Sequence, residues 1–185
     1  PFNDFEYVPW IDPHMSLIES QYGNKMRVKE YKEALAAGWH VGLGNNADAH
    51  TATWGVRRGR TSIVAPALTH YQVLEALRLR RTFATEDENL ALVMRADDYW
   101  MGSVLRDGPL HFEIYAFDPD PGDEIATLYL YRNNEVFSST IVNATSFTWT
   151  LSLPAPSPPG TWWYAQATQH DGKRAYTSPI WAFDP

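Results

Sequence analysis

The sequence predicts an α/β segment followed by an all-β domain. Before about residue 88, short apolar runs alternate with two segments of helical periodicity. After that point helical periodicity disappears, and short β-rich runs separated by turn residues take over. A length of 185 residues suits one large domain or two small ones. We therefore predict a domain boundary between residues 1–88 and 89–185.

Composition narrows the possible functions. Apolar residues make up 44% of the chain and the mean hydropathy is −0.38, values that predict a soluble, globular protein. A net charge of −7 argues against nucleic-acid binding, which needs a basic face. No apolar run is long enough to predict a membrane span. The absence of cysteine excludes disulfides and Cys-ligated zinc. Because the chain begins at Pro1 without Met, we expect it to be a piece of a longer protein.

The first half of the α/β segment contains a strand, a helix and a second strand. The short apolar run at residues 15–19 predicts a strand that ends on a carboxylate. Over residues 25–37 the side chains of Val28, Tyr31 and Leu35 recur at helical spacing, and Gly38 stands where a left-handed C-cap belongs. Residues 39–43 predict the next strand.

The second half of this segment repeats the alternation. Residues 62–65 predict a strand, and Thr69 with Gln72 three residues later predicts a capping box. The helix that follows, from residue 70 to about 80, should bury Val73, Leu74 and Leu77. Such alternation of strand and helix is typical of βα units, and it predicts a parallel sheet or barrel.

Residues 89–185 predict an antiparallel β-sandwich of immunoglobulin-like type. The dipeptides Asn133-Asn134 and Asp171-Gly172 should close hairpins as tight turns. The predicted strands are residues 90–95, 110–117, 125–132, 135–141, 146–153, 161–168 and 174–183.

A carboxylate and an imidazole follow the strand at residues 39–43. On an extended backbone Asp48 and His50 share one face, so the pair could ligate Zn, Mn or Fe. Glu19, at the end of an earlier strand, is a further candidate ligand. The alternatives remain open: Asp48 as a turn residue beside a packed His50, and Glu19 as a solvated carboxylate. The other histidines, including His40, are interpreted as structural or surface residues.

Two other groups of side chains have both a structural and a functional interpretation. Arg57, Arg58 and Arg60 could bind the anion of a substrate, because guanidinium groups recognise phosphate oxygens, or they could form a solvated face. The aromatic residues of the Trp-rich strands at 99–100, 149 and 162–163 could stack on sugar rings or fill the core.

Several motifs, taken in order along residues 16–105, resemble the polymerase-and-histidinol-phosphatase (PHP) superfamily of metallohydrolases, in the branch where a β-sandwich follows the barrel. The motifs are Leu17-Ile18-Glu19-Ser20, Gly38-Trp39, Asn46-Ala47-Asp48-Ala49-His50, Gly59-Arg60-Thr61, Arg80-Arg81-Thr82-Phe83-Ala84-Thr85 and Met101-Gly102.

The resemblance implies that residues 1–88 are the last βα units of a distorted TIM-like barrel. It implies a hydrolase that acts on small-molecule phosphoesters through a metal-bound hydroxide, with two or three divalent ions of Zn, Mn or Fe. Glu19 would bridge metal ions, and Asp48 and His50 would each ligate one. The family's early His-x-His motif and middle ligands have no counterpart here. The chain is therefore expected to need the missing N-terminal part of the barrel and to be inactive alone, and no catalytic residue can be assigned.

An alternative function belongs to a different class. The β-sandwich could be a noncatalytic binding module that recognises a glycan or a protein partner, with Trp162 or Trp163 in contact with the glycan. In either case a barrel without its early strands would expose a parallel edge. We therefore also expect a possible homo-oligomer formed through residues 15–65.

Overall fold

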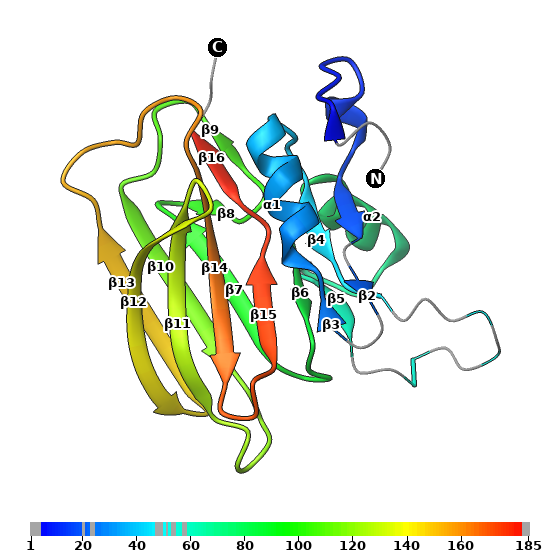
Figure 1. Cartoon of the computed structure of the whole chain (residues 1–185), viewed down its shortest axis with the longest axis vertical. Coiled ribbons are helices and arrows are strands. Elements are labelled where there is room, and N and C mark those ends of the chain that lie inside the picture. The colour runs from blue at the N-terminus through cyan, green and yellow to red at the C-terminus, as the bar shows by residue number, and fades with distance from the viewer. Residues whose placement is uncertain are drawn as a thin grey trace.

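The computed structural model describes residues 5–19, 21–22, 25–46, 50, 52, 55–56 and 59–182. Within these residues β-strands dominate, and the two α-helices are short (Figure 1). Neither helix is long and apolar enough to cross a membrane, as far as the described part of the chain goes. The helices are α1 (Val28–Ala37) and α2 (His70–Arg78).

The N-terminal part is a small layer built around α1. A short 3-10 helix, η2 (Asp12–His14), precedes β1 (Leu17–Glu19), which pairs in parallel with β4 (Gly42–Gly44). Along the chain, β1 and β4 are separated by α1 and by the short antiparallel pair of β2 (Gln21–Tyr22) and β3 (Lys25–Met26).

The predicted helix over residues 25–37 is confirmed for residues 28–37, whereas Lys25 and Met26 form β3. It begins at Val28 and ends at Gly38, whose φ of 108° is the left-handed C-cap expected of a glycine. The predicted Thr69 cap is confirmed as well, because its hydroxyl accepts a hydrogen bond from the backbone N–H of Gln72.

Two mainly antiparallel sheets form the rest of the molecule. The smaller has the strand order β13-β10-β7-β8, and the larger has the order β12-β11-β14-β15-β6-β5, with β16 paired to β14 and to β9. In chain order the strands are β5 (Arg60–Ile63), β6 (Thr82–Thr85), β7 (Ala91–Ala96), β8 (Tyr99–Trp100), β9 (Val104–Leu105), β10 (His111–Phe117), β11 (Ile125–Arg132), β12 (Glu135–Ala144), β13 (Ser146–Ser152), β14 (Trp162–Gln169), β15 (Arg174–Thr177) and β16 (Ile180–Ala182).

The tight turns predicted for this region follow from backbone conformation. Asn133 and Asn134 both have positive φ, at 49° and 69°, and they join β11 to β12. Gly172 has a φ of 86° between β14 and β15. The predicted β-sandwich is therefore present, with its strands close to the predicted positions.

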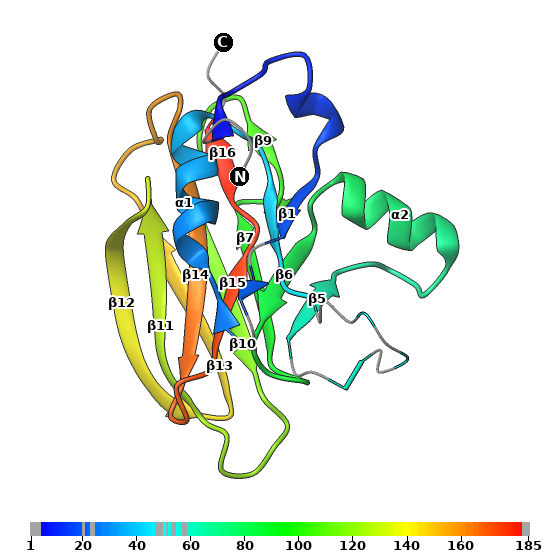
Figure 2. The same cartoon turned by 45° about the vertical axis from the view of Figure 1, so that its right-hand side comes forward.

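The burial of β14 shows how the layers stack. Trp163, Ala165 and Ala167 belong to the core cluster that fills the space between the two sheets. Tyr164 points to the other face, where it packs in a second cluster with Tyr31 of α1. Since both faces are covered, β14 is buried almost throughout, whereas β10 alternates between buried and exposed residues. Figure 2 shows α1 lying over the larger sheet.

The predicted PHP-type barrel is wrong, and with it the resemblance to that superfamily. Parallel pairing of the expected kind stops after β1 and β4. The next strand, β5, pairs antiparallel with β6, so α2 connects two antiparallel strands and no further parallel βα unit forms among the described residues. The α/β plus all-β fold class is corrected to an all-β sandwich with a small α1 layer. The alternation of strand and helix predicted the wrong fold because it does not specify strand direction.

The second helix differs from its prediction in packing. Of the residues expected to be buried, Leu74 is exposed and Val73 and Leu77 are half-buried, while Ala76 alone in α2 is buried. The helix projects from the edge of the molecule next to β5 (Figure 2).

An ion pair between the buried carboxylate of Glu86 and the half-buried Arg174 joins the α1 layer to the sandwich. Glu86 accepts hydrogen bonds from Arg174 through both carboxylate oxygens, at 2.9 Å from Nη2 and 3.1 Å from Nε. It also accepts from the backbone N–H of Met26 at 2.8 Å. The larger sheet runs across the predicted boundary at residue 88, since β6 pairs with β15. The boundary itself stays a prediction.

Candidate functional site

The predicted metal ligands do not form a centre that the structure describes. Glu19, at the end of β1, and His50 are both exposed. Asp48 lies outside the described residues. Within the part of the chain that is described, neither Glu19 nor His50 belongs to a group of three side chains able to share a metal ion. The three-ligand site, the metal ions and the hydrolase activity stay predictions, and the resemblance no longer supports them.

The predicted anion-binding arginines are described only in part. Arg57 and Arg58 lie outside the described residues. Arg60 begins β5, and its guanidinium donates hydrogen bonds to the carbonyl oxygens of Gly59 at 3.0 Å and Gly55 at 3.1 Å. These bonds engage two of its nitrogens in holding the local loop.

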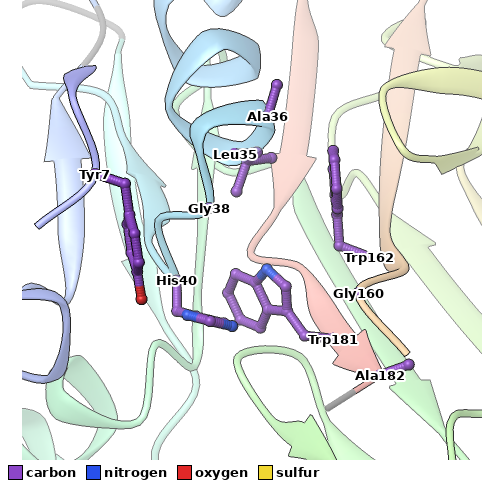
Figure 3. Close-up of a pocket in the computed structure, with 9 residues that line it drawn as sticks. All are labelled: Tyr7, Leu35, Ala36, Gly38, His40, Gly160, Trp162, Trp181 and Ala182. Atoms are coloured by element: carbon purple, nitrogen blue, oxygen red, sulfur yellow. The ribbon is translucent and has the colours of Figure 1, made fainter. Parts of the chain in front are cut away.

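The structure brings together a different group of residues, in a cleft at the C-terminal end of α1. The cleft has a volume of about 300 Å³ and lies between that helix and the ends of β14 and β16 (Figure 3). Its aromatic walls come from distant parts of the chain: Tyr7, His40, Trp162 and Trp181. Aliphatic and glycine residues complete the lining. A concavity lined by aromatic and aliphatic residues with a few polar groups is typical of small-ligand sites.

A buried carboxylate fixes the polar side of the cleft. Asp12 is 7% exposed, and one of its oxygens accepts a hydrogen bond from the backbone N–H of His40 at 2.7 Å. Its other oxygen lies 2.8 Å from His40 Nδ1 and 3.5 Å from the Tyr7 hydroxyl. Because a carboxylate accepts, Nδ1 carries the proton, and Nε2 is left on the cleft side of the ring. His40 therefore presents its second ring nitrogen to the cleft in a fixed orientation.

Aromatic contacts hold the cleft walls in place. The His40 ring lies 5.1 Å from the ring of Trp181, and the Arg80 guanidinium lies 5.4 Å from the same ring on β16. Tyr7 packs edge-to-face on Trp39 at 5.5 Å, and Trp39 donates its Nε1–H to the carbonyl oxygen of Phe5. Burial and the neighbouring Asp12 raise the pKa of Tyr7, so its hydroxyl stays neutral at physiological pH.

The two adjacent tryptophans of β14 have different environments. Trp162 is half-buried and lines the cleft. Trp163 points to the opposite face, is 1% exposed, packs 5.0 Å from the ring of Phe112, and donates Nε1–H to Ser157 Oγ at 2.9 Å. Of the two residues predicted to contact a glycan, only Trp162 is placed to do so.

Sequence reasoning missed Asp12 and His40. His40 was interpreted as a structural or surface residue, and Asp12 stands beside Pro13 at the start of η2. Their pairing spans 28 positions and no short motif records it. The one signal in the sequence was the tryptophan at position 162.

Comparison with known proteins adds little to this geometry. No family model matches the chain, and no curated protein matches it. Among solved structures, the chain is similar to one described as fibronectin(III)-like modules of Clostridium thermocellum CbhA, at 16% sequence identity. That match covers 50% of this chain and 97% of the other, with a TM-score of 0.32.

Proposed function

We propose that this chain is a noncatalytic β-sandwich binding module that recognises a neutral oligosaccharide in the cleft between α1, β14 and β16. One observation carries the proposal: an aromatic cleft whose polar edge, His40, is held in a single orientation by the buried Asp12.

The chemistry of the walls favours a sugar. The flat faces of Trp162 and Tyr7 offer apolar surface for the C–H face of a pyranose ring. His40 Nε2 and the Tyr7 hydroxyl can form hydrogen bonds with ring hydroxyls at the edge. The net charge of −7 and the carboxylate of Asp12 disfavour anionic glycans. A volume of about 300 Å³ is at the lower end of the range for ligand pockets, which suits a short stretch of sugar chain.

The test is affinity electrophoresis of the intact chain in gels that contain soluble β-glucan, xylan, mannan or heparin, followed by titration calorimetry with the matching oligosaccharide. We expect retardation by at least one neutral polysaccharide and none by heparin. Trp162→Ala and His40→Ala should each weaken binding at least tenfold. The matched control is Trp100→Ala, because Trp100 lies on β8 in the smaller sheet and does not line the cleft.

Two results would contradict the proposal. If no neutral glycan retards the wild-type chain, a protein partner becomes the better occupant of the cleft. If Trp100→Ala weakens binding as much as Trp162→Ala, the ligand lies elsewhere on the sandwich.

A further inference from the structure

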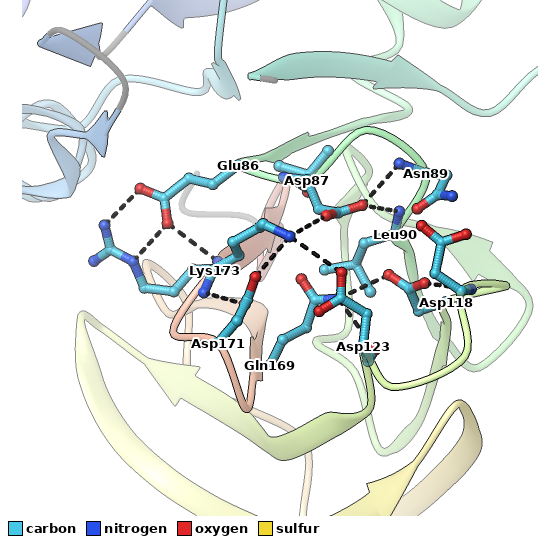
Figure 4. A network of polar contacts seen from close by, with 12 residues as sticks. Glu86, Asp87, Asn89, Leu90, Asp118, Asp123, Gln169, Asp171 and Lys173 are labelled. Carbon is cyan, nitrogen blue, oxygen red and sulfur yellow. Dashed lines mark hydrogen bonds and ion pairs between the residues drawn. The ribbon is translucent and has the colours of Figure 1, made fainter. Parts of the chain in front are cut away.

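A group of carboxylates lies at the end of β14 opposite the cleft. Asp87 follows β6, and Asp118 and Asp123 belong to the loop between β10 and β11, in the run Asp118-Pro119-Asp120-Pro121-Gly122-Asp123. One oxygen from each of the three aspartates lies within 4.8 Å of the others (Figure 4). Asp87 and Asp118 are buried, at 4% and 0% exposed, which is unusual for carboxylates.

A buried amide in this group has an oxygen without a hydrogen-bond partner. Gln169 is 2% exposed, and its Nε2 donates to Asp118 Oδ2 at 2.7 Å and to the carbonyl oxygen of Asp123 at 3.2 Å. These two bonds place the amide inside the carboxylate group. Its Oε1 is buried and has no hydrogen-bond partner among the described residues. A buried acceptor left without a partner is costly, and here it is one more oxygen ligand beside three carboxylates.

Among the described residues, the Lys173 ammonium contacts this group but does not balance its negative charge. Lys173 Nζ lies 2.6 Å from Asp171, 2.8 Å from Asp87 and 3.1 Å from Asp123. Asp118 is held instead by the backbone N–H of Asp120 and by Gln169. One ammonium thus contacts three carboxylates, and the fourth, that of Asp118, has no contact with it. Burial, together with the charges of Asp87, Asp120 and Asp123, raises the pKa of Asp118, as expected where negative charge is in excess.

A cavity gives an ion access to this group. It has a volume of about 170 Å³ and is lined by Asp87, Glu88, Asp120, Asp123 and Lys173. Oxygen ligands alone, with no nitrogen or sulfur, suit Ca²⁺, which accepts irregular sets of six to eight oxygens. Mg²⁺ requires a strict octahedron and Zn²⁺ prefers nitrogen or sulfur.

We propose that one Ca²⁺ binds between Asp87, Asp118 and Asp123, with Gln169 Oε1 as a further ligand and water in the remaining positions. With the ion bound, Lys173 keeps Asp171 as its partner. The ion would tie the loops after β6 and β10 to the last residue of β14, and the site is independent of the proposed glycan cleft.

The test uses CaCl2 alone on the EDTA-treated intact chain. Extracellular modules hold Ca²⁺ with Kd values of about 0.1–1 mM, so 10 mM CaCl2 should raise the melting midpoint by roughly 3–11 °C. Titration calorimetry should show one saturable site. NaCl at equal ionic strength should leave the midpoint unchanged, and MgCl2 should bind at least tenfold more weakly.

Asp118→Asn is the decisive variant. The new amide can still accept from the Asp120 N–H, and the Gln169 amide can turn over to accept from it, so folding should be preserved. We expect at least a tenfold loss of Ca²⁺ affinity. Asp107→Asn makes the same change of charge at an exposed position and should bind like the wild type.

Three results would overturn the proposal. The first is wild-type protein that shows neither a shift nor binding heat at 10 mM CaCl2. The second is an Asp118→Asn variant that binds Ca²⁺ as the wild type does. The third is a Lys173→Met variant that binds Ca²⁺ while the wild type does not, which would identify the ammonium as the permanent counter-ion.

Discussion

Removal of the Glu86 carboxylate should weaken the attachment of the α1 layer to the sandwich and lower the free energy of unfolding. In Glu86→Ala, Arg174 loses the carboxylate acceptors of its Nε, its Nη2 and its backbone N–H, and the Met26 N–H loses its acceptor. Breaking a buried pair costs about 3–5 kcal/mol. The Arg174 side chain keeps 30% of its surface in water, so we expect about 3 kcal/mol, the lower end of that range. For a chain of this length that is a fall of roughly 6–12 °C in the melting midpoint.

Urea unfolding followed by circular dichroism measures this loss, and hydrogen exchange locates it. Amides of α1 should exchange faster in Glu86→Ala, whereas those of β10 and β13 should be unchanged at low denaturant. Glu33→Ala is the control, because Glu33 forms an exposed pair with Lys29 on α1 and should change stability by less than about 0.5 kcal/mol. A double-mutant cycle with Arg174→Met should give a coupling of at least about 1 kcal/mol. Equal stability of Glu86→Ala and Glu33→Ala would refute the reasoning.

Three further predictions concern stability. Tyr31→Phe removes a buried hydroxyl that has no partner among the described residues, so it should leave stability unchanged or raise it by about 1 kcal/mol in urea unfolding, whereas Tyr164→Phe loses a bond to Asn134 and should lower it. Gly102→Ala should melt lower than Gly122→Ala: both glycines have positive φ, but a Cβ at 102 would collide with the Leu79 carbonyl, while at 122 it meets open space. Burial raises the pKa of Asp87. Hydrogen bonds from the Asn89 N–H, Lys173 and the Leu90 N–H together lower this pKa by a larger amount, so the net pKa lies below its usual value. Because the pKa of Asp87 is lower in the folded state than in the unfolded state, its ionised carboxylate stabilises the fold above about pH 4, and this stabilisation is lost as the pH falls further. Urea unfolding at pH 6, 4 and 3 should therefore show a smaller loss of stability in acid for Lys173→Met than for the wild type.

The sequence predicted local structure well and long-range pairing poorly. Helix α1 was predicted from the spacing of Val28, Tyr31 and Leu35, and the turn at Asn133-Asn134 from residues that tolerate positive φ. Both are local properties. Strand direction is not local, because whether β5 runs parallel or antiparallel to β6 depends on pairing partners up to a hundred positions away. The barrel was predicted from the alternation of strand and helix and from short motifs, neither of which specifies strand direction, and it was wrong for that reason.

The candidate site shows the same limit. Trp162 was recognised because a tryptophan is conspicuous in any sequence, but its alternation with Trp163 was needed to decide which ring faces the core. Asp12 and His40 meet only after η2 folds back against the segment that follows α1. Neither Gln169 nor Lys173 was singled out, since their roles depend on three loops meeting at one end of the sandwich.

The position of β15 affects how the protein can fold as it is made. This strand lies between β14 and β6, so residues 82–85 cannot join the larger sheet until residues 174–177 have left the ribosome. At the usual rates of translation the intervening stretch takes roughly 4–18 s to synthesise. For most of that time Tyr31 and Leu35 of α1 have no Tyr164 to pack on. The strands of the smaller sheet can pair earlier. In the nascent chain the amides of the sandwich strands should therefore become protected from exchange before those of the α1 layer. Chaperones should accordingly bind the N-terminal third of the chain.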